Sequence, residues 1–367
     1  MVAGCAGRYG GNRRHGLVLP WFESYHEVAS RLGHFIRNAA MEREFHRWLQ
    51  ERLPQHGRLA VPVGDDAAIL QLDATNCVVT TDTISDEVDF HLSETPARAI
   101  GHKALGINLS DLAAMAAQPV GCVVNLMLPR ENTLELAKEI IEGMLPLAAE
   151  LDCPIAGGDV HVWDHPLAVT ITAMGQVADE TSKAKTESQL LPAVRRSGAQ
   201  PGDLILVTGA VGGSILGRHL NVRPRIREMR AICELCEVHA AIDCSDGLAL
   251  DLQRMAEASG VGAELFAQQI PIHKDAHALA NQTSRSPLDH ALHDGEDFEL
   301  ILAVEPNTAK SLPNVLDISW FGETASTQLS TIGRIISESG LWLFDEETSE
   351  GRRKRDPLQP KGYEHGN

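Results

Sequence analysis

Aspartates follow apolar runs at several points in this chain, and carboxylate oxygens in such places are typical of a metal-phosphate site. The first of them, Asp65 and Asp66, lie in VGDDAAIL. The run from Cys77 to Val79 is apolar and predicts a buried strand. At its C-terminal end, where ligand sites are common, we expect Thr80, Thr81 and Asp82. Carboxylates gathered in this way repel one another, and a bound Mg²⁺ ion relieves the repulsion.

Residues 93–96 are predicted to open a long helix, with a capping hydroxyl ahead of Pro96 in its first turn. Asn108 and Asp111 are three residues apart in it and therefore share a face. That face offers a second source of metal-ligating oxygen. On spacing alone, Asp111 is equally well interpreted as a solvated or capping residue.

Two glycine-containing loops could approach a phosphate. Gly157, Gly158 and Asp159 are expected in a turn after a short strand, where glycine lets the backbone come close to a ligand. Arg196 lies in RRSGAQPGD, and its forked guanidinium suits a phosphate, although most surface arginines are simply solvated. The chain contains no GxxxxGK[ST], which excludes a P-loop as the phosphate cradle.

The second half of the chain repeats the pattern of acidic residues behind a strand. A strand ending at Ile242 leads into Asp243, Ser245 and Asp246, with a helix after them. Helix capping is the alternative interpretation of these side chains. Glu296, in GEDFEL, lies at the mouth of another apolar strand.

Composition narrows the class of protein. A formal net charge of -18 over 367 residues argues against nucleic acid as a partner, because phosphate backbones require a basic face. No apolar run approaches the roughly 18 residues that cross a bilayer, so we expect no membrane association. Seven scattered cysteines favour a reduced, cytoplasmic setting. Cys233 and Cys236 have a fragment of zinc-site spacing, but ordinary packing is the preferred interpretation.

The length of the chain, together with a polar stretch that contains prolines and glycines, predicts two domains joined by a linker. A strand at 120–128 and a helix at 131–150 begin an alternating β/α pattern. The expected segments are a disordered extension at 1–40, an N-terminal domain at 41–178, a linker at 179–203, a C-terminal domain at 204–345 and a tail at 346–367.

Taken together and in this order, seven motifs resemble those of the thiamine-monophosphate kinases: VGDDAAIL, TTDT, NLSDLAAM, AGGD, RRSGAQPGD, DCSDG and GEDFEL. The resemblance covers roughly residues 41 to 345 and implies an α/β (α+β) chain. It further implies the two-domain aminoimidazole-ribonucleotide-synthetase-like fold, with the N-terminal sheet pairing across a homodimer. The implied reaction converts ATP and thiamine monophosphate into ADP and thiamine diphosphate.

The resemblance also assigns roles. The implied Mg²⁺ ligands are Asp66, Thr80, Thr81, Asp82, Asp111, Asp159, Asp243 and Asp246, of which Asp82, Asp111 and Asp246 are the catalytic residues. The implied ATP contacts are Gly158, Asp159, Arg196 and Ser245. The implied substrate contacts are Glu296, Tyr363 and Asp89. Asp89 stands where the family usually has a histidine before its phenylalanine.

This chemistry agrees with the residue types. A phosphate monoester is already an anionic nucleophile, so the task is to bring two anions together rather than to supply a strong base. Two alternatives remain open at this stage. One is another ATP-using enzyme of the same superfamily, such as a ribonucleotide cyclo-ligase or a selenophosphate synthetase. The other is a non-catalytic nucleotide- or metal-binding relative, suggested by Asp89.

Overall fold

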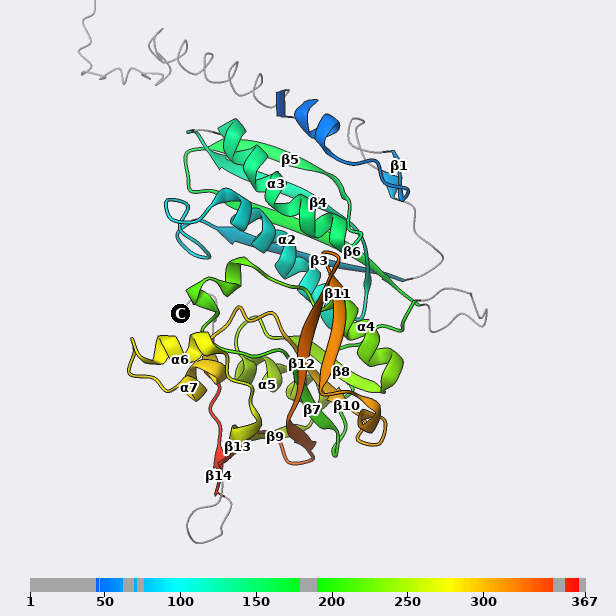
Figure 1. The fold of residues 1–367 in the computed structure, drawn as a ribbon, viewed down its shortest axis with the longest axis vertical. Coiled ribbons are helices and arrows are strands. Elements are labelled where there is room, and N and C mark those ends of the chain that lie inside the picture. Colours follow the sequence, from blue (N-terminus) through cyan, green and yellow to red (C-terminus); the bar gives the residue numbers. More distant parts are fainter. Residues whose placement is uncertain are drawn as a thin grey trace, which may run out of the picture.

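The chain forms two halves, each built on one main β-sheet (Figure 1). The computed structural model describes residues 44–45, 47–61, 69–70, 76–131, 133–178, 190–345 and 354–362. The sheet of the N-terminal half has the strand order β3-β6-β4-β5. Its strands are β3 (Asn76–Ser85), β6 (Ala168–Val177), β4 (Gln118–Pro129) and β5 (Ile155–Trp163). A short antiparallel pair, β1 (Leu59–Val61) and β2 (Ile69–Leu70), precedes it.

The two faces of this sheet differ in their surroundings. On β6, Val169, Ile171 and Ala173 are buried while the residues between them are not, so every second side chain points into the core. Helices α2 (Ala97–Ala114) and α3 (Thr133–Glu150) cover that core face (Figure 1). The opposite face is left open by the described residues, and Val79 on it is 61% exposed.

Helices α2 and α3 confirm the long helices predicted to open at 93–96 and at 131–150, although α2 begins only after Pro96. They cross closely at two glycines: a Cβ on Gly101 would lie 1.9 Å from the Ile140 carbonyl oxygen, and one on Gly143 would lie 2.0 Å from that of Arg98. The predicted hydroxyl cap is wrong, because α2 begins after Pro96 without a side-chain cap. The Pro96 carbonyl accepts the first-turn amides instead.

Two strand predictions are also wrong in extent. β3 does not end after Val79 but continues to Ser85, because β6 pairs with all ten of its residues and β-branched threonines suit a strand. Thr80, Thr81 and Asp82 therefore lie inside the strand. Similarly, Gly157–Asp159 lie within β5, paired with β4, rather than in a turn.

The C-terminal half contains an eight-stranded sheet with the path β14-β13-β9-β12-β7-β10-β8, and β11 pairs with β12 beside it. Its strands are β7 (Leu204–Thr208), β8 (Val238–Asp243), β9 (Gly262–Phe266), β10 (Leu300–Val304), β11 (Val315–Trp320), β12 (Glu323–Ile336), β13 (Gly340–Asp345) and β14 (Lys354–Pro357). Its helices are α4 (Ile226–Leu235), α5 (Leu248–Ser259), α6 (Lys274–Ala280) and α7 (Pro287–His293).

Helix α2 belongs to the cores of both halves. Its residues up to Leu112 pack in the N-terminal core, whereas Ala113 and Ala114 join Met229 and Ile232 of α4 against the C-terminal sheet. The side chains along α2 can therefore reach groups from either half. This shared helix positions the site described below.

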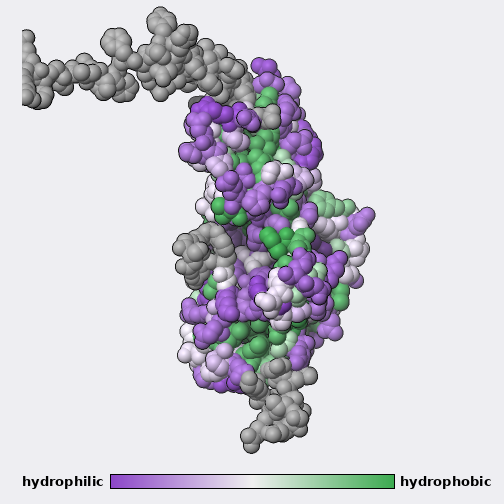
Figure 2. All heavy atoms as spheres, turned by 90° about the vertical axis from the view of Figure 1, so that its left-hand side faces the viewer, coloured by the Kyte–Doolittle hydropathy of each residue, from purple (hydrophilic) through white to green (hydrophobic). Residues whose placement is uncertain are grey.

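The surface is largely hydrophilic on the face shown in Figure 2, with a hydrophobic area near mid-height. Hydrophilic predominance agrees with a chain whose acidic residues outnumber its basic ones by 50 to 32. Across the described ranges, no helix combines the length and the apolar character that crossing a bilayer requires.

Candidate active site

Strand β3 and helix α2 bring the first pair of carboxylates together. Thr80 and Asp82 alternate with Thr81 and face the core side of the sheet, toward α2. Thr80 Oγ1 donates to Asp111 Oδ2 at 2.5 Å. The Asp82 amide donates to Asn108 Oδ1 at 3.1 Å. The shared helix face predicted for Asn108 and Asp111 is therefore confirmed, and both residues lie against β3.

A third carboxylate comes from the C-terminal half. Asp243 ends β8, is only 3% exposed, and accepts a hydrogen bond of 2.8 Å from Ser110 Oγ on α2. This bond connects the two halves at the acidic site. A buried carboxylate held in this way is an acceptor with spare lone pairs rather than a helix cap.

Asp246 lies in the loop between β8 and α5. Arg254 of α5 donates to its Oδ2, and the Asp246 amide donates to Asp251 Oδ2 at 2.9 Å. Arg254 also donates to Asp251 Oδ1 at 2.9 Å. The loop is thus fixed by Asp251, and one oxygen of Asp246 is already paired with a cation of the same chain.

The carboxylates share one electrostatic environment. Burial, followed by the charges of Asp111 and Asp246, raises the pKa of Asp82 to about 6. Burial, followed by the charges of Asp111 and Asp251, raises the pKa of Asp243 to about 8. Burial also raises the pKa of Asp111, although Thr80 and Arg196 oppose that rise. Negative charge is therefore in excess where the two halves meet.

The donor set fits Mg²⁺, because it consists of carboxylate and hydroxyl oxygens from three elements. In the described residues, no group of three or more carboxylate, histidine or cysteine side chains is arranged to hold a metal ion by itself. An open arrangement agrees with the way Mg²⁺ is bound, since it retains several waters and the phosphates of its ligand. The acidic cluster is defined here as Thr80, Asp82, Asp111, Asp243 and Asp246.

A cavity of about 390 Å³ adjoins this acidic cluster. Thr80, Asp111 and Asp243 lie on its polar side together with Arg196. Arg195 and Ser197 line it as well, and the other walls are apolar, formed by Val78, Val79, Leu112, Ala114, Met115, Ala241 and Ala258. A flat apolar group can lie between such walls while an attached anion reaches the arginine and any cations held by the carboxylates.

The loop that carries Arg196 is tied to the C-terminal half. Ser259 Oγ donates to the Arg196 carbonyl at 3.2 Å and accepts from the Gly198 amide at 3.1 Å. The Ala241 amide donates to the Arg195 carbonyl at 2.9 Å. Arg196 itself is exposed, so its guanidinium is held at the cavity edge by its backbone and stays accessible to an anion.

Thr81, Gly158 and Asp159 are not brought to the acidic cluster within this chain. Thr81 points to the open face of the sheet, where Asp159 also lies according to the strand register. Strands β6 and β4 separate β5 from β3, a spacing of about 14 Å for three strand intervals. Gly158 is required by packing, because a Cβ there would lie 1.8 Å from the Val124 carbonyl oxygen.

Two of the proposed substrate residues, Asp89 and Glu296, contact a lysine that the motifs did not identify. Lys103 Nζ on α2 lies 2.5 Å from Glu296 Oε1 and donates to the Asp89 carbonyl at 2.9 Å. The Asp89 carboxylate instead accepts from the Ser85 amide at 2.7 Å, which closes the turn after β3. The sequence did offer a sign of this lysine, because the helical period places Lys103 one turn after Ile100, on the buried face of the helix.

Ser245 contributes a backbone contact, since its carbonyl accepts from the Glu296 amide at 2.6 Å. Asp66 and Tyr363 lie outside the described residues. The last described residue, Gly362, packs on the acidic loop: a Cβ there would lie 2.5 Å from the Asp246 carbonyl oxygen. The chain that follows β14 therefore returns to the Asp246 loop.

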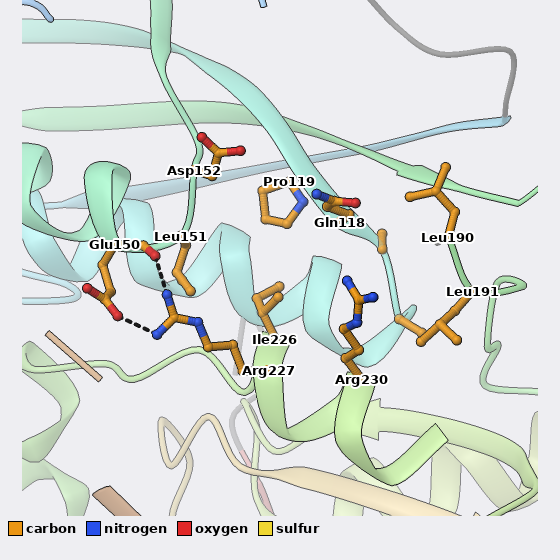
Figure 3. Close-up of a pocket in the computed structure, with 12 residues that line it drawn as sticks. Gln118, Pro119, Glu150, Leu151, Asp152, Leu190, Leu191, Ile226, Arg227 and Arg230 are labelled. Atoms are coloured by element: carbon orange, nitrogen blue, oxygen red, sulfur yellow. Dashed lines mark hydrogen bonds and ion pairs between the residues drawn. The ribbon is translucent and has the colours of Figure 1, made fainter. Parts of the chain in front are cut away.

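A second, smaller pocket of about 170 Å³ lies where α4 meets the ends of α3 and β4 (Figure 3). It includes none of the predicted site residues. Arg227 in its wall bonds both the side chain and the carbonyl of Glu150, as well as the Ser319 carbonyl. This pocket is a joint between the halves, where an arginine of α4 fastens the end of α3.

The cysteine pair belongs to ordinary packing. Cys233 lies in α4 and Cys236 follows its end, and burial raises the pKa of the two thiols to about 12 and about 11. Thiols with raised pKa values are poor zinc ligands. The described residues hold no histidine and cysteine group that could bind a metal ion.

Comparison with known proteins extends these observations. Residues 64–177 match the AIR synthase related protein, N-terminal domain, and residues 191–341 match the AIR synthase related protein, C-terminal domain. The thiamine-monophosphate kinase of Rhodopirellula baltica is 40% identical over 334 residues, which is 89% of this chain and 98% of that protein.

Two solved structures share the fold. The crystal structure of thiamine-monophosphate kinase from Stenotrophomonas maltophilia K279a is 31% identical with a TM-score of 0.63, covering 82% of this chain and 94% of that one. The structure of AaThiL complexed with AMPPCP and TMP has a TM-score of 0.64 at 22% identity, covering 83% and 92%. Identity of this extent over nearly the whole of a relative decides the family, and this chain belongs to the thiamine-monophosphate kinases.

Proposed function

We propose that this chain transfers the terminal phosphoryl group of ATP to thiamine monophosphate, producing thiamine diphosphate and ADP. The observation that carries the proposal is the meeting of Asp82, Asp111 and Asp243, from both halves, beside the cavity that Arg196 borders. The names of the family members support the same reaction.

ATP is the phosphoryl donor in this proposal, and it binds in the 390 Å³ cavity. The apolar walls suit an adenine ring, and Arg196 at the edge suits a phosphate oxygen. Ser245, Gly158 and Asp159 are assigned to the nucleotide on the family resemblance. Support for this donor also comes from AaThiL, which was solved with AMPPCP and TMP.

Mg²⁺, when bound, supplies the positive charge that neutralises and aligns the two phosphates. The residues that hold it in this proposal are the acidic cluster, with Asp66, Thr81 and Asp159 added on the family resemblance. Asp82, Asp111 and Asp246 are assigned as the catalytic members on the family resemblance, because their carboxylates would hold the cations that neutralise the transferring group. Arg254 orients Asp246 by occupying one of its oxygens.

The acceptor needs no strong general base, since a phosphate monoester is already an anion near neutral pH. The chain's task is to place that phosphate in line with the donor. Glu296, Asp89 and Tyr363 are assigned to the acceptor, and Glu296 lies in the loop whose backbone bonds Ser245. Acceptor and donor sites therefore share one loop contact.

A homodimer in the cytoplasm is the proposed form of the protein, without nucleic acid or membrane partners. The open face of the N-terminal sheet supports a second copy, because Val79 and its neighbours would be covered there. A monomer at micromolar concentration, measured by light scattering, would contradict this part of the proposal.

The reaction is tested by measuring ADP formation with ATP, thiamine monophosphate and Mg²⁺, each omitted in turn. We expect turnover only when all three are present. A panel of other phosphate acceptors separates this reaction from those of other ATP-using members of the superfamily. Absence of turnover, together with tight binding of thiamine diphosphate, would show that the kinase proposal is wrong.

A further inference from the structure

Lys103 is the only lysine that is buried among the described residues, and its side chain is 1% exposed. An ammonium group removed from water is strongly unfavourable unless acceptors surround it. Lys103 lies on α2, the helix shared by both halves, and the groups that it contacts there must offset the cost of its burial.

Those contacts come from the two segments assigned to the acceptor substrate. Lys103 Nζ donates to the Asp89 carbonyl at 2.9 Å and lies 2.5 Å from Glu296 Oε1. Asp89 belongs to the turn after β3, in the N-terminal half, whereas Glu296 precedes β10 in the C-terminal half. One buried cation thus joins both segments.

The Glu296 loop is held in an unusual conformation. Glu296 has φ of 61°, a left-handed value that side chains other than glycine seldom adopt. Its amide donates to the Ser245 carbonyl at 2.6 Å, and Ser214 Oγ donates to the Gly295 carbonyl at 2.7 Å. With the backbone fixed and Oε1 paired with Lys103, the carboxylate has little freedom to turn.

The ion pair changes what Glu296 can do for a ligand. Its charge is already balanced by Lys103, yet its side chain remains 31% exposed. A balanced carboxylate is a weak counter-ion for a cationic ring but remains a good acceptor for an N–H donor. Thiamine monophosphate carries such a donor in the exocyclic amine of its aminopyrimidine ring.

His219 is a further titratable group that interacts with this pair. Burial lowers the pKa of His219 and the charge of Lys103 adds to this, while the Ser214 hydrogen bond and the charge of Glu296 oppose it. His219 Nδ1 is 2.9 Å from the Ser214 carbonyl, so the ring is engaged with the adjacent loop. A neutral imidazole leaves the Lys103–Glu296 charges matched one to one.

We propose that Lys103 is a positioning residue for the acceptor, holding Glu296 as an oriented hydrogen-bond acceptor for the aminopyrimidine amine and tying it to the Asp89 turn. This inference rests on the proposed function and adds the group that selects the acceptor. Lys103 acts through Glu296 and does not touch the substrate.

The test compares Lys103→Met, Glu296→Gln and the double variant, with Lys310→Met as the matched control on the exposed surface. Lys103→Met is expected to raise the KM for thiamine monophosphate by roughly tenfold to a hundredfold, the range for a hydrogen bond to a charged group. The KM for ATP should change by less than about twofold, because the cavity is lined by other residues. Lys310→Met should leave both KM values unchanged.

The double variant distinguishes an oriented acceptor from a counter-ion. In Glu296→Gln, Lys103 holds the amide oxygen and the amide nitrogen faces the ligand, so acceptor binding is lost. In the double variant neither side chain is an unpaired buried charge, and the amide can turn its oxygen to the amine. We therefore expect the double variant to bind thiamine monophosphate better than Glu296→Gln alone, measured by calorimetry.

Three results would overturn the inference. They are unchanged KM values in Lys103→Met, equal increases for ATP and for thiamine monophosphate, and a double variant that binds no better than Glu296→Gln. If Lys103→Met does not fold, the comparison of the double variant with Glu296→Gln still decides. Inactivity of the unaltered protein toward thiamine monophosphate would instead contradict the proposed function itself.

Discussion

Helix α2 contributes one member to each of two charged regions, Asp111 to the acidic cluster and Lys103 to the ion pair with Glu296, but the balance of charge differs between them. In the acidic cluster, burial and the charge of Asp111 raise the pKa values of Asp82 and Asp243. At the other site, the Glu296 carboxylate already has a cation of the same chain within 2.5 Å. The acidic cluster therefore carries excess negative charge, whereas the charges of Lys103 and Glu296 neutralise each other.

The difference shows which ligand each region suits. Uncompensated carboxylates are costly to the folded protein and gain most from cations brought in with a nucleotide. A neutralised ion pair is rigid, and it suits a ligand that is recognised by a directional hydrogen bond rather than by its net charge. Removing one charge should therefore stabilise the folded protein in the acidic cluster and destabilise it in the Lys103–Glu296 pair.

The largest expected effect is that of Asp82→Asn, which removes charge from the acidic cluster. We expect kcat to fall on the order of 10³-fold, because Asp82 would hold a cation that stabilises the charge of the transition state. Without Mg²⁺, the melting temperature should rise, because Asp111 and Asp246 lose a repelling neighbour. Asp317→Asn, on the exposed surface of β11, is the control. Unchanged turnover in Asp82→Asn would contradict the metal assignment.

The next effect concerns the donor side alone. Arg196→Ala should raise the KM for ATP by roughly tenfold or more, because a charge-assisted contact to a phosphate is lost. The KM for thiamine monophosphate should change little, which is the reverse of the expectation for Lys103→Met. Steady-state kinetics with each substrate varied in turn measure this contrast. Equal changes in the KM values for ATP and for thiamine monophosphate would show that the two regions do not bind separate substrates.

A pH series tests the unbalanced charge. Asp82 and Asp243 have folded-state pKa values of about 6 and about 8, above the value of about 4 in an unfolded chain. Between about pH 4 and pH 8 these two groups therefore bind more protons in the folded protein than in the unfolded chain, and their contribution to the free energy of unfolding falls as pH rises. Mg²⁺ binds the deprotonated form, so it should raise the melting temperature more at about pH 8 than at about pH 5. An equal gain at both pH values would contradict the assignment.

The smallest expected effect is that of Ser110→Ala. This change removes the hydrogen bond to Asp243 between the two halves and leaves a buried acceptor with one partner fewer. The free energy of unfolding should decrease by about 1 kcal/mol, measured by denaturant titration. Ser311→Ala, at an exposed position, serves as the comparison and should leave stability unchanged.

The sequence by itself determined the family and the main elements. The apolar periods of α3 and β4 appear in the chain as written, and seven ordered motifs identify the thiamine-monophosphate kinases without any structure. The spacing of Asn108 and Asp111 also fixed their common face, because helical geometry is local.

The tertiary structure decided which of these side chains meet. The pairing of β3 with β6 extends the strand to Ser85 and sends Asp82 toward α2 while Thr81 faces the opposite side. No local pattern predicts that Lys103 contacts Glu296, because those two residues are joined only when the two halves pack on α2. Helical and strand periods are set by the backbone within a few residues, whereas burial and the partners of a charge depend on segments far apart in the chain.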